Sequence, residues 1–391
     1  MATPKLKPIR FFATNRDRSN LGRTFDQADR IQLQKGGYHW IDMKRFMAHY
    51  LATTDQITMP PEAIILDSEE KIFEDFLAKP AIKRIIIGIH GYNVPFHGAL
   101  TSFSLLADTL SQVLEEKHNK ILITDPITAE KYENGEIKVE YDKRLNDEAS
   151  DLTAFIGFSW PSNGNVLDYI SDRVEAMQTA PILGNLISYI RKQNPNAKVH
   201  IIAHSMGNYL TCNMLGGSVI ETFTPLSATG NATIENQLKR QNTDEGKGKW
   251  FVDRYLMLAP DVERREVTQC DVDGIAGGKT DYTGPFYEGI ENLVEETHLF
   301  YSRHDNALKA SVVEKEVVNE LGQKVAEFFT QPDLNKRWES SLGLNPLPAL
   351  APDNMYGHNA TVLTNREIDH GDYFDSLAIA EKLVEIIMQA G

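Results

Sequence analysis

The segment KVHIIAHSMGN (residues 198–208) joins a strand-like run to a stretch of small and polar residues. The apolar, β-branched run ends at Ala203, and Ser205 follows, with Gly207 two residues further on. A strand that turns sharply into a helix crowds its own backbone, so small residues are needed on both sides of the turn. Ala203 and Gly207 meet that need in the pattern A-x-S-x-G. We interpret Ser205 as a nucleophile exposed at such an elbow; the alternative is an ordinary turn that contains Ser and Gly.

Short apolar runs alternate with longer helical patterns through the rest of the chain. The runs are continuous in hydrophobicity, which is typical of central parallel strands covered on both faces. The segments between them carry apolar residues at three- and four-residue spacing. We therefore predict a doubly wound, mostly parallel α/β sheet. The predicted strands are 84–91, 152–160, 199–205, 251–260 and 297–305, and the predicted helices are 97–119, 167–194 (kinked or broken at Pro181) and 373–390.

The 391 residues are interpreted as a single domain, 1–391, that carries polar insertions. The insertions are placed at about 120–150, 217–249 and 263–296, at the edges of the sheet, and one of them is a candidate cover for the site. Because the last two lack the long apolar face of a lipid-activated lid, they favour small soluble substrates.

Composition excludes several classes of partner. The net charge of −15 argues against nucleic acid and against an anionic membrane surface, both of which attract basic proteins. No run of 18 apolar residues and no apolar leader is present, so neither a membrane span nor a signal peptide is expected. With only Cys212 and Cys270, the chain is predicted to be reduced and cytoplasmic.

No metal ion or other cofactor is expected. The DVDG stretch at 271–274 resembles a calcium loop, but its glycine is misplaced and its twelfth position is Tyr282 rather than glutamate. The GIAGGKT stretch at 274–280 lacks the spacing of a phosphate-binding loop.

A second glycine motif, GIHGYN (88–93), ends an earlier predicted strand. A nucleophilic serine needs two preorganised donors for the oxyanion that develops during attack. The backbone N–H groups of Tyr92 and Met206 are the candidates, and Gly91 permits the close approach. His90 is interpreted as shaping this loop rather than as a base; a plain strand-end turn is the alternative.

A base and an acid are needed to activate Ser205. In a doubly wound hydrolase the base follows nucleophile and acid in the chain, which favours His370 in REIDHGDYF, before the last predicted helix. Asp305 follows the second strand past Ser205 and is the preferred acid; Asp261 follows the next strand and is the alternative. The histidines judged less suitable are His200, His204 and His358.

Six motifs together resemble one known family: FFATNR (11–16), HGYN (90–93), FSWPSNG (158–164), AHSMGN (203–208), LAPDV (258–262) and YSRHDNAL (301–308). The chain resembles the α/β-hydrolase family called DUF900. The resemblance implies an α/β-hydrolase fold and a serine hydrolase of the esterase or lipase type.

These observations lead to one expected function and its alternatives. We expect a carboxylic-ester hydrolase that acts through an acyl-enzyme at Ser205 on small-molecule, short-chain soluble esters. One alternative is a catalytically silent α/β-hydrolase fold that serves as a binding module. Another is an amidase or acyltransferase that uses the same residues.

Overall fold

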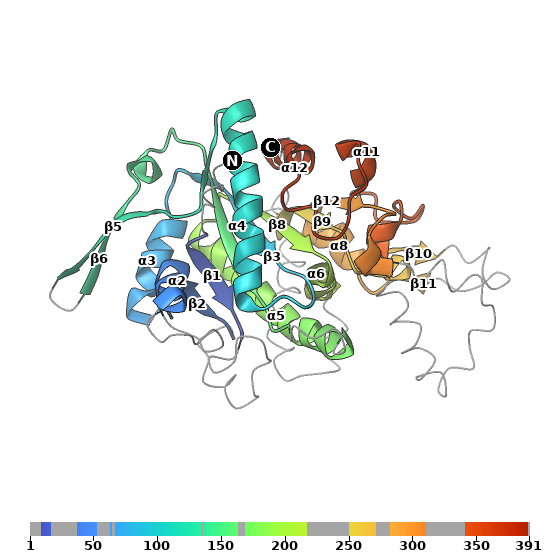
Figure 1. Ribbon diagram of the computed structural model, residues 1–391, viewed down its shortest axis with the longest axis horizontal. Coiled ribbons are helices and arrows are strands. Elements are labelled where there is room, and N and C mark those ends of the chain that lie inside the picture. Colours follow the sequence, from blue (N-terminus) through green and yellow to red (C-terminus); the bar gives the residue numbers. More distant parts are fainter. Residues whose placement is uncertain are drawn as a thin grey trace, which may run out of the picture.

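A single large sheet forms the centre of the protein (Figure 1). The computed structural model describes residues 9–16, 37–52, 63–64, 67–133, 136–162, 169–216, 250–270, 282–309 and 341–389. Within these ranges the sheet has nine strands in the order β13-β12-β9-β8-β3-β7-β1-β2, with β4 also paired to β7. All neighbours are parallel except the antiparallel pair β1 and β2. The strands are β1 (Phe11–Thr14), β2 (His39–Asp42), β3 (Ile82–Ile89), β4 (Ile121–Ile123), β7 (Leu152–Ser159), β8 (Lys198–His204), β9 (Val252–Leu258), β12 (Val294–Tyr301) and β13 (Met355–Asn359).

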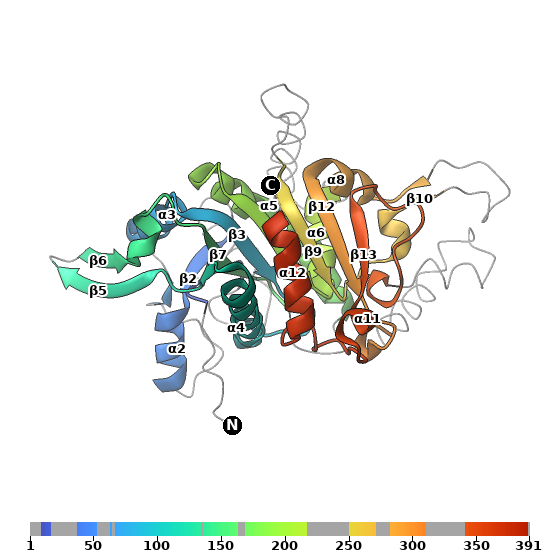
Figure 2. The same ribbon diagram turned by 90° about the horizontal axis from the view of Figure 1, so that it is seen from above.

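Helices cover both faces of this sheet, as the view in Figure 2 shows. One apolar core lies between the sheet and α5 (Tyr169–Gln193), α6 (Met206–Gly216) and α8 (Tyr287–Leu293). The other lies between the sheet and α4 (Phe96–Val113) and α12 (Leu377–Gln389). Strands buried on both sides must be apolar throughout, which is why the sequence runs are continuous rather than alternating. The other α-helices in the described ranges are α2 (Met43–Ala52), α3 (Asp67–Leu77) and α11 (Ala360–Thr364).

The predicted doubly wound sheet is confirmed, and each predicted strand exists to within a few residues. The helix predicted at 97–119 is α4 followed by a π-helical turn, Leu114–His118. The expected kink or break at Pro181 is corrected in part, because α5 continues as one helix through that residue. The flanking side chains of Ala180, Ile182 and Leu183 are buried in the core. Packing of this kind outweighs the hydrogen bond that a proline removes from a helix.

Two of the three predicted insertions differ from the expectation. Segment 120–150 contributes β4 to the main sheet, and then forms a separate hairpin of β5 (Ile127–Glu133) and β6 (Glu136–Tyr141) that projects from one end of the molecule (Figure 2). Segment 263–296 contains the crossover helix α8 and the start of β12, besides the short pair β10 (Gln269–Cys270) and β11 (Tyr282–Thr283). Segment 217–249 and the stretch 271–281 lie outside the described residues.

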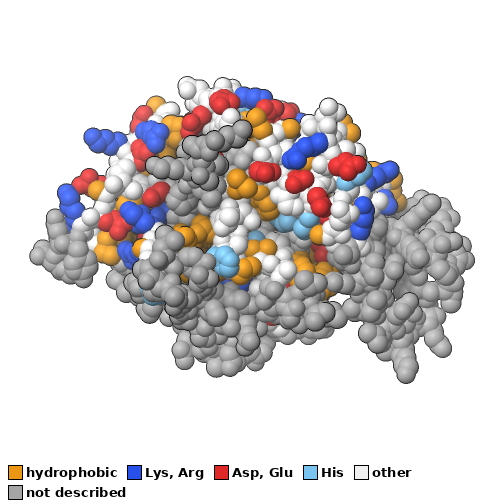
Figure 3. Space-filling view, in the orientation of Figure 1, with side chains coloured by type: hydrophobic (Ala, Val, Ile, Leu, Met, Phe, Trp, Pro, Cys, Tyr) orange, Lys and Arg blue, Asp and Glu red, His pale blue; other side chains and the backbone are white. Residues whose placement is uncertain are grey.

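Charged side chains of both signs are interspersed on the described part of the face in Figure 3. No single-sign patch dominates that part of the surface. None of the helices in the described ranges is both long and apolar enough to cross a membrane.

His200 lies in the middle of β8, is fully buried, and has neither ring nitrogen hydrogen bonded. Burial lowers its pKa to about 3; Asp253 opposes this, while Arg84, Arg191 and Arg254 add to it. In the unfolded chain His200 therefore binds a proton as the pH falls below about 6.5, whereas in the folded chain it stays neutral until the pH approaches 3. Stability from this residue is complete above that pH and is lost as the pH falls towards 3.

We predict that His200→Leu weakens the acid sensitivity of the fold. Between pH 7 and pH 5 the free energy of unfolding should fall by roughly 2 kcal/mol less than in the wild type, as measured by urea denaturation. His97→Gln, a change at an exposed histidine of α4, is the control and should leave the slope unaltered. Equal slopes in His200→Leu and the wild type would contradict the prediction.

Candidate active site

Ser205 sits at a strained turn between β8 and α6. Its φ of 52° lies in the left-handed region, which is costly for a residue with a side chain. The turn is held from the neighbouring strand, because the Ser205 N–H donates to the Leu258 carbonyl (3.0 Å) and the Ser205 carbonyl accepts from the Asp261 N–H (3.2 Å). The buried Asn208 amide also donates to the Ser205 and Leu258 carbonyls, at 3.1 and 3.2 Å. These bonds compensate the strain of the backbone. Ser205 is only 5% exposed, whereas the sequence led us to expect an exposed nucleophile.

Loop 90–94, which follows β3, packs directly against this turn. A Cβ added to Gly207 would lie 2.4 Å from the His90 carbonyl oxygen, and one added to Gly91 would lie 2.6 Å from the Ser205 Cβ. No side chain fits at either glycine without movement. Met206 is the first residue of α6, and the N–H groups of a helix's first turn have no acceptor within the helix. The structure thus brings Tyr92 and Met206, on the loop and the helix, to the two sides of the elbow.

His370 and Asp305 form a hydrogen-bonded pair. The His370 Nδ1 donates to the Asp305 Oδ2 at 2.7 Å, and the other carboxylate oxygen accepts from the Leu308 N–H at 2.9 Å. The Asp305 side chain is fully buried, whereas that of His370 is 23% exposed. With Nδ1 protonated towards Asp305, Nε2 is left to accept a proton. Among the described residues Ser205 and His370 share no hydrogen bond, and such bonds often tighten only when substrate is bound.

The loop that carries His370 is tied to the loop that carries Asp305. The Asp369 carboxylate accepts from the Asn306 N–H at 3.0 Å and from the His370 N–H at 2.9 Å. One turn earlier, the Ser302 hydroxyl donates to the Ile368 carbonyl at 2.7 Å. These hydrogen bonds therefore hold the two loops together.

His204 contacts His370, and the sequence did not indicate this contact. Its Nε2 donates to the His370 carbonyl at 2.8 Å, and the two rings lie 4.5 Å apart between centroids. Burial lowers the pKa of His204 well below the usual value, with a further contribution from His370, so its ring is neutral. Sequence reasoning placed His204 away from the nucleophile and gave it no function; it touches the predicted base instead.

Asp261 has different partners. Its carboxylate accepts from the Tyr169 hydroxyl at 2.7 Å and from the Ser341 hydroxyl at 2.9 Å. Asp261 is 2% exposed, and His370 donates its hydrogen bond to Asp305 instead. The geometry therefore favours Asp305 as the acid of a Ser-His-Asp set.

Comparison with known protein families assigns this chain to one of them. Residues 65–366 match the family model described as "Alpha/beta hydrolase of unknown function (DUF900)". The chain belongs to the DUF900 family of α/β hydrolases. The resemblance seen in the sequence is confirmed, and the matched range holds Ser205 and Asp305 but ends before His370.

Two individual proteins are similar to this DUF900 chain. An uncharacterized protein of Nostoc sp. strain PCC 7120 is 62% identical over 382 residues, which is 98% of this chain and 94% of the relative. A crystal structure of Aspergillus fumigatus lipase B aligns with a TM-score of 0.36 and 11% identity. That alignment covers 80% of this chain and 54% of the lipase chain, so this chain spans about half of the lipase.

Aromatic and charged side chains of α5, α6 and loop 90–94 contact one another near the elbow in this DUF900 protein. Tyr92 meets Tyr169 edge to face, with ring centroids 5.5 Å apart. Arg173 stacks over the ring of Tyr209 at 3.7 Å, one helical turn past Ser205. A weak ion pair joins Arg173 to Glu266 at 3.5 Å. This group of side chains is therefore polar as well as aromatic.

The other histidines weighed from the sequence lie elsewhere. His358 is on β13 and meets His298 of β12, with His298 Nδ1 and His358 Nε2 3.0 Å apart. His200 is enclosed within β8. Within the described ranges no group of three or more His, Cys, Asp or Glu residues is arranged to hold a metal ion.

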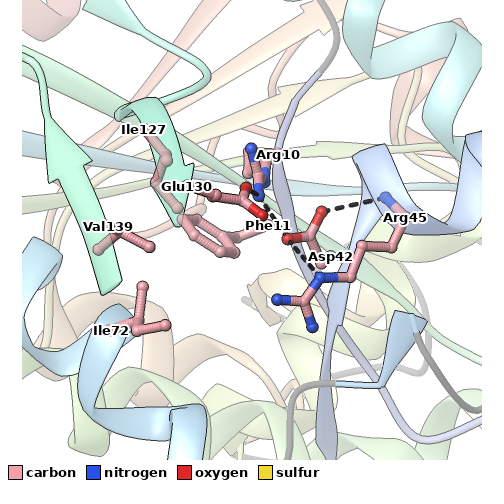
Figure 4. A pocket seen from close by; sticks show the side chains of 8 residues that line it. All are labelled: Arg10, Phe11, Asp42, Arg45, Ile72, Ile127, Glu130 and Val139. Carbon is pink, nitrogen blue, oxygen red and sulfur yellow. Dashed lines mark hydrogen bonds and ion pairs between the residues drawn. The ribbon is translucent and has the colours of Figure 1, made fainter. Parts of the chain in front are cut away.

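A small pocket lies far from this chemistry, between β1, β2 and the β5–β6 hairpin (Figure 4). Its polar wall is an ion-pair cluster in which Arg10 contacts Asp42 at 2.7 Å and also contacts Glu130, while Arg45 reaches Asp42 at 3.6 Å. The apolar wall consists of Phe11, Ile72, Ile127 and Val139. These ion pairs fasten the hairpin to the sheet, which gives the pocket a structural explanation.

We predict that Asp305→Asn slows the reaction of Ser205 with a fluorophosphonate by about 10⁴, because an amide favours the wrong tautomer of His370. Asp261→Asn is the matched control. It should lower the unfolding temperature through its lost bonds while leaving the labelling rate close to that of the wild type. The reverse pattern would transfer the acid role to Asp261.

A second prediction concerns the contact between the loop and the elbow. Gly91→Ala places a methyl group against the Ser205 Cβ, so loop 90–94 must shift and the labelling rate should fall by about 10²–10³, as when one oxyanion donor is lost. Gly184→Ala in α5 is the control, since its Cβ would meet only Met214 at 3.5 Å. Unchanged labelling in a folded Gly91→Ala protein would exclude the loop from the site.

Proposed function

We propose that this protein hydrolyses carboxylic esters through an acyl-enzyme on Ser205. The observation that carries the proposal is the strained elbow: a serine at φ 52° follows His204, whose ring contacts His370 of the hydrogen-bonded His370–Asp305 pair. Strain at a non-glycine residue persists only where the surroundings enforce it, and it gathers at reactive sites. Membership of an α/β-hydrolase family of unknown function supports the hydrolase class and leaves the substrate open.

In the proposed mechanism His370 acts as general base and then as general acid. Its Nε2 takes the proton as the Ser205 Oγ attacks the carbonyl carbon, and Asp305 stabilises the imidazolium that forms. The N–H groups of Tyr92 and Met206 would stabilise the oxyanion. As the C–O bond breaks, the leaving alkoxide takes the proton from His370. Water, deprotonated by the same nitrogen, then releases the acid and restores Ser205.

The preferred substrates are proposed to be short-chain, soluble esters. The charged pair of Arg173 and Glu266, which lies next to Tyr209 of α6, favours a polar substrate over a long acyl chain. The polar, glycine-bearing composition of segment 217–249 supports the same preference. Amide hydrolysis and acyl transfer need the same residues and remain the alternatives within this chemistry.

The proposal is tested with p-nitrophenyl esters of graded chain length on the wild type and Ser205→Ala. We expect turnover of the acetate and butyrate esters, little turnover of long-chain esters, and a fall of about 10⁶ in kcat for Ser205→Ala. A fluorophosphonate adduct should appear on Ser205 by peptide mass analysis. A wild-type protein that neither turns over any ester nor forms the adduct would favour the silent binding module instead.

A further inference from the structure

Two arginines flank β1, and both are buried. Arg10 precedes the strand and is 2% exposed, while Arg16 follows it and is 0% exposed. Because β1 runs parallel to β7, Arg16 lies at the edge of the sheet where the parallel strands end and Ser205 emerges. Arg10 lies at the other end of β1, in the ion-pair cluster drawn in Figure 4. One residue type therefore occupies two buried positions at opposite ends of one strand.

Arg16 donates hydrogen bonds to loop 90–94 and to the end of β7. Its Nη2 donates to the Val94 carbonyl at 2.6 Å and lies 3.3 Å from the His90 Nε2. Its Nε donates to the Ser159 hydroxyl at 2.9 Å, and its Nη1 reaches the Ser162 carbonyl at 3.4 Å. The planar guanidinium thus joins both ends of the loop to the strand beside it.

The same two loop ends have further anchors from the chain after β7. The Trp160 Nε1 donates to the His90 carbonyl at 2.7 Å, and the Trp160 N–H donates to the His90 Nε2 at 3.2 Å. The Val94 N–H donates to the Ser162 hydroxyl at 3.3 Å, and that hydroxyl donates to Asp172 of α5 at 2.7 Å. The loop is therefore held at its first and last residues, and its middle residues face the elbow.

We propose that Arg16 is a positioning residue that fixes loop 90–94 so that the Tyr92 N–H points at the oxyanion formed on Ser205. The inference rests on the proposed function of Ser205. A hydrogen-bond donor contributes to catalysis only if it is preorganised where charge develops, so a shift of about 1 Å in this loop is costly. Arg16 does not touch the substrate; it acts through the Val94 carbonyl and the His90 ring.

The charge of Arg16 also fixes the state of His90. Burial lowers the pKa of Arg16 to about 9, with Asp172 and Glu175 opposing, so the guanidinium stays charged at neutral pH. Burial and the Arg16 charge lower the pKa of His90 well below its usual value. Neutral His90 accepts at Nε2 and donates from Nδ1 to the Gly91 carbonyl at 2.8 Å. His90 therefore has a single tautomer, and its ring hydrogen bonds hold loop 90–94 to Trp160.

The test compares Arg16→Met with Arg10→Met in the full-length protein. We expect Arg16→Met to lower kcat for p-nitrophenyl acetate by about 10²–10³, the effect of one lost oxyanion donor, and to leave KM within about threefold. The rate of fluorophosphonate labelling at Ser205 should fall by the same factor. Arg10→Met should lower the unfolding temperature at least as much while kcat and labelling rate stay at the wild-type level.

Two further variants keep the test decisive if Arg16→Met does not fold. Arg16→Lys retains a cation and a donor for the Val94 carbonyl, so it should recover part of kcat without a change in KM. Trp160→Phe keeps the ring that stacks on His90 but loses the Nε1 donor, and should lower kcat about tenfold. Folded variants at Arg16 and Trp160 with wild-type kcat and labelling rate would overturn the inference. That result, with Ser205→Ala inactive, would leave the proposed function standing.

Discussion

The close contact between two backbone turns is the constraint on which the rest of the site depends. Loop 90–94 and the turn at Ser205 approach until no Cβ can stand at Gly91 or Gly207. The oxyanion role proposed for the N–H groups of Tyr92 and Met206 depends on this contact, because backbone atoms at this distance leave little freedom for either turn to move. The left-handed Ser205 follows from the same crowding, since a relaxed turn would carry the helix away from the loop.

Buried polar groups with hydrogen-bond partners surround this contact. Arg16, Asp305 and Asp261 are each at most 2% exposed. Removing charges from water is costly unless hydrogen bonds replace the lost hydration, and each of these three has such partners. Networks of this kind rigidify a structure because every member must stay in place for the others to remain satisfied. The edge of the sheet where Ser205 emerges is therefore stiff although it carries many charged groups.

The two arginines at the ends of β1 illustrate how position gives a residue its role. Arg10 is surrounded by carboxylates and fastens a hairpin, while Arg16 donates chiefly to neutral oxygens of the strand ends and of loop 90–94. Both are equally hidden from solvent, so burial alone does not separate a structural arginine from a positioning one. What separates them is the element that receives their hydrogen bonds.

The sequence by itself determined the strands β3, β7, β8, β9 and β12 and the elbow, because continuous apolar runs and a serine between small residues are local patterns. It did not indicate the short strands β1, β2, β4 and β13 or the order of the strands in the sheet. It also ranked Asp305 above Asp261 by strand counting, and the structure adds the hydrogen bond that His370 donates to Asp305. Only the tertiary structure decided the partners of Arg16, His204 and Trp160. These residues contact segments as far as 166 positions away along the chain, and no local pattern encodes such pairs. Core packing of the residues around Pro181 likewise keeps α5 continuous at this position, where local propensity indicated a kink or break.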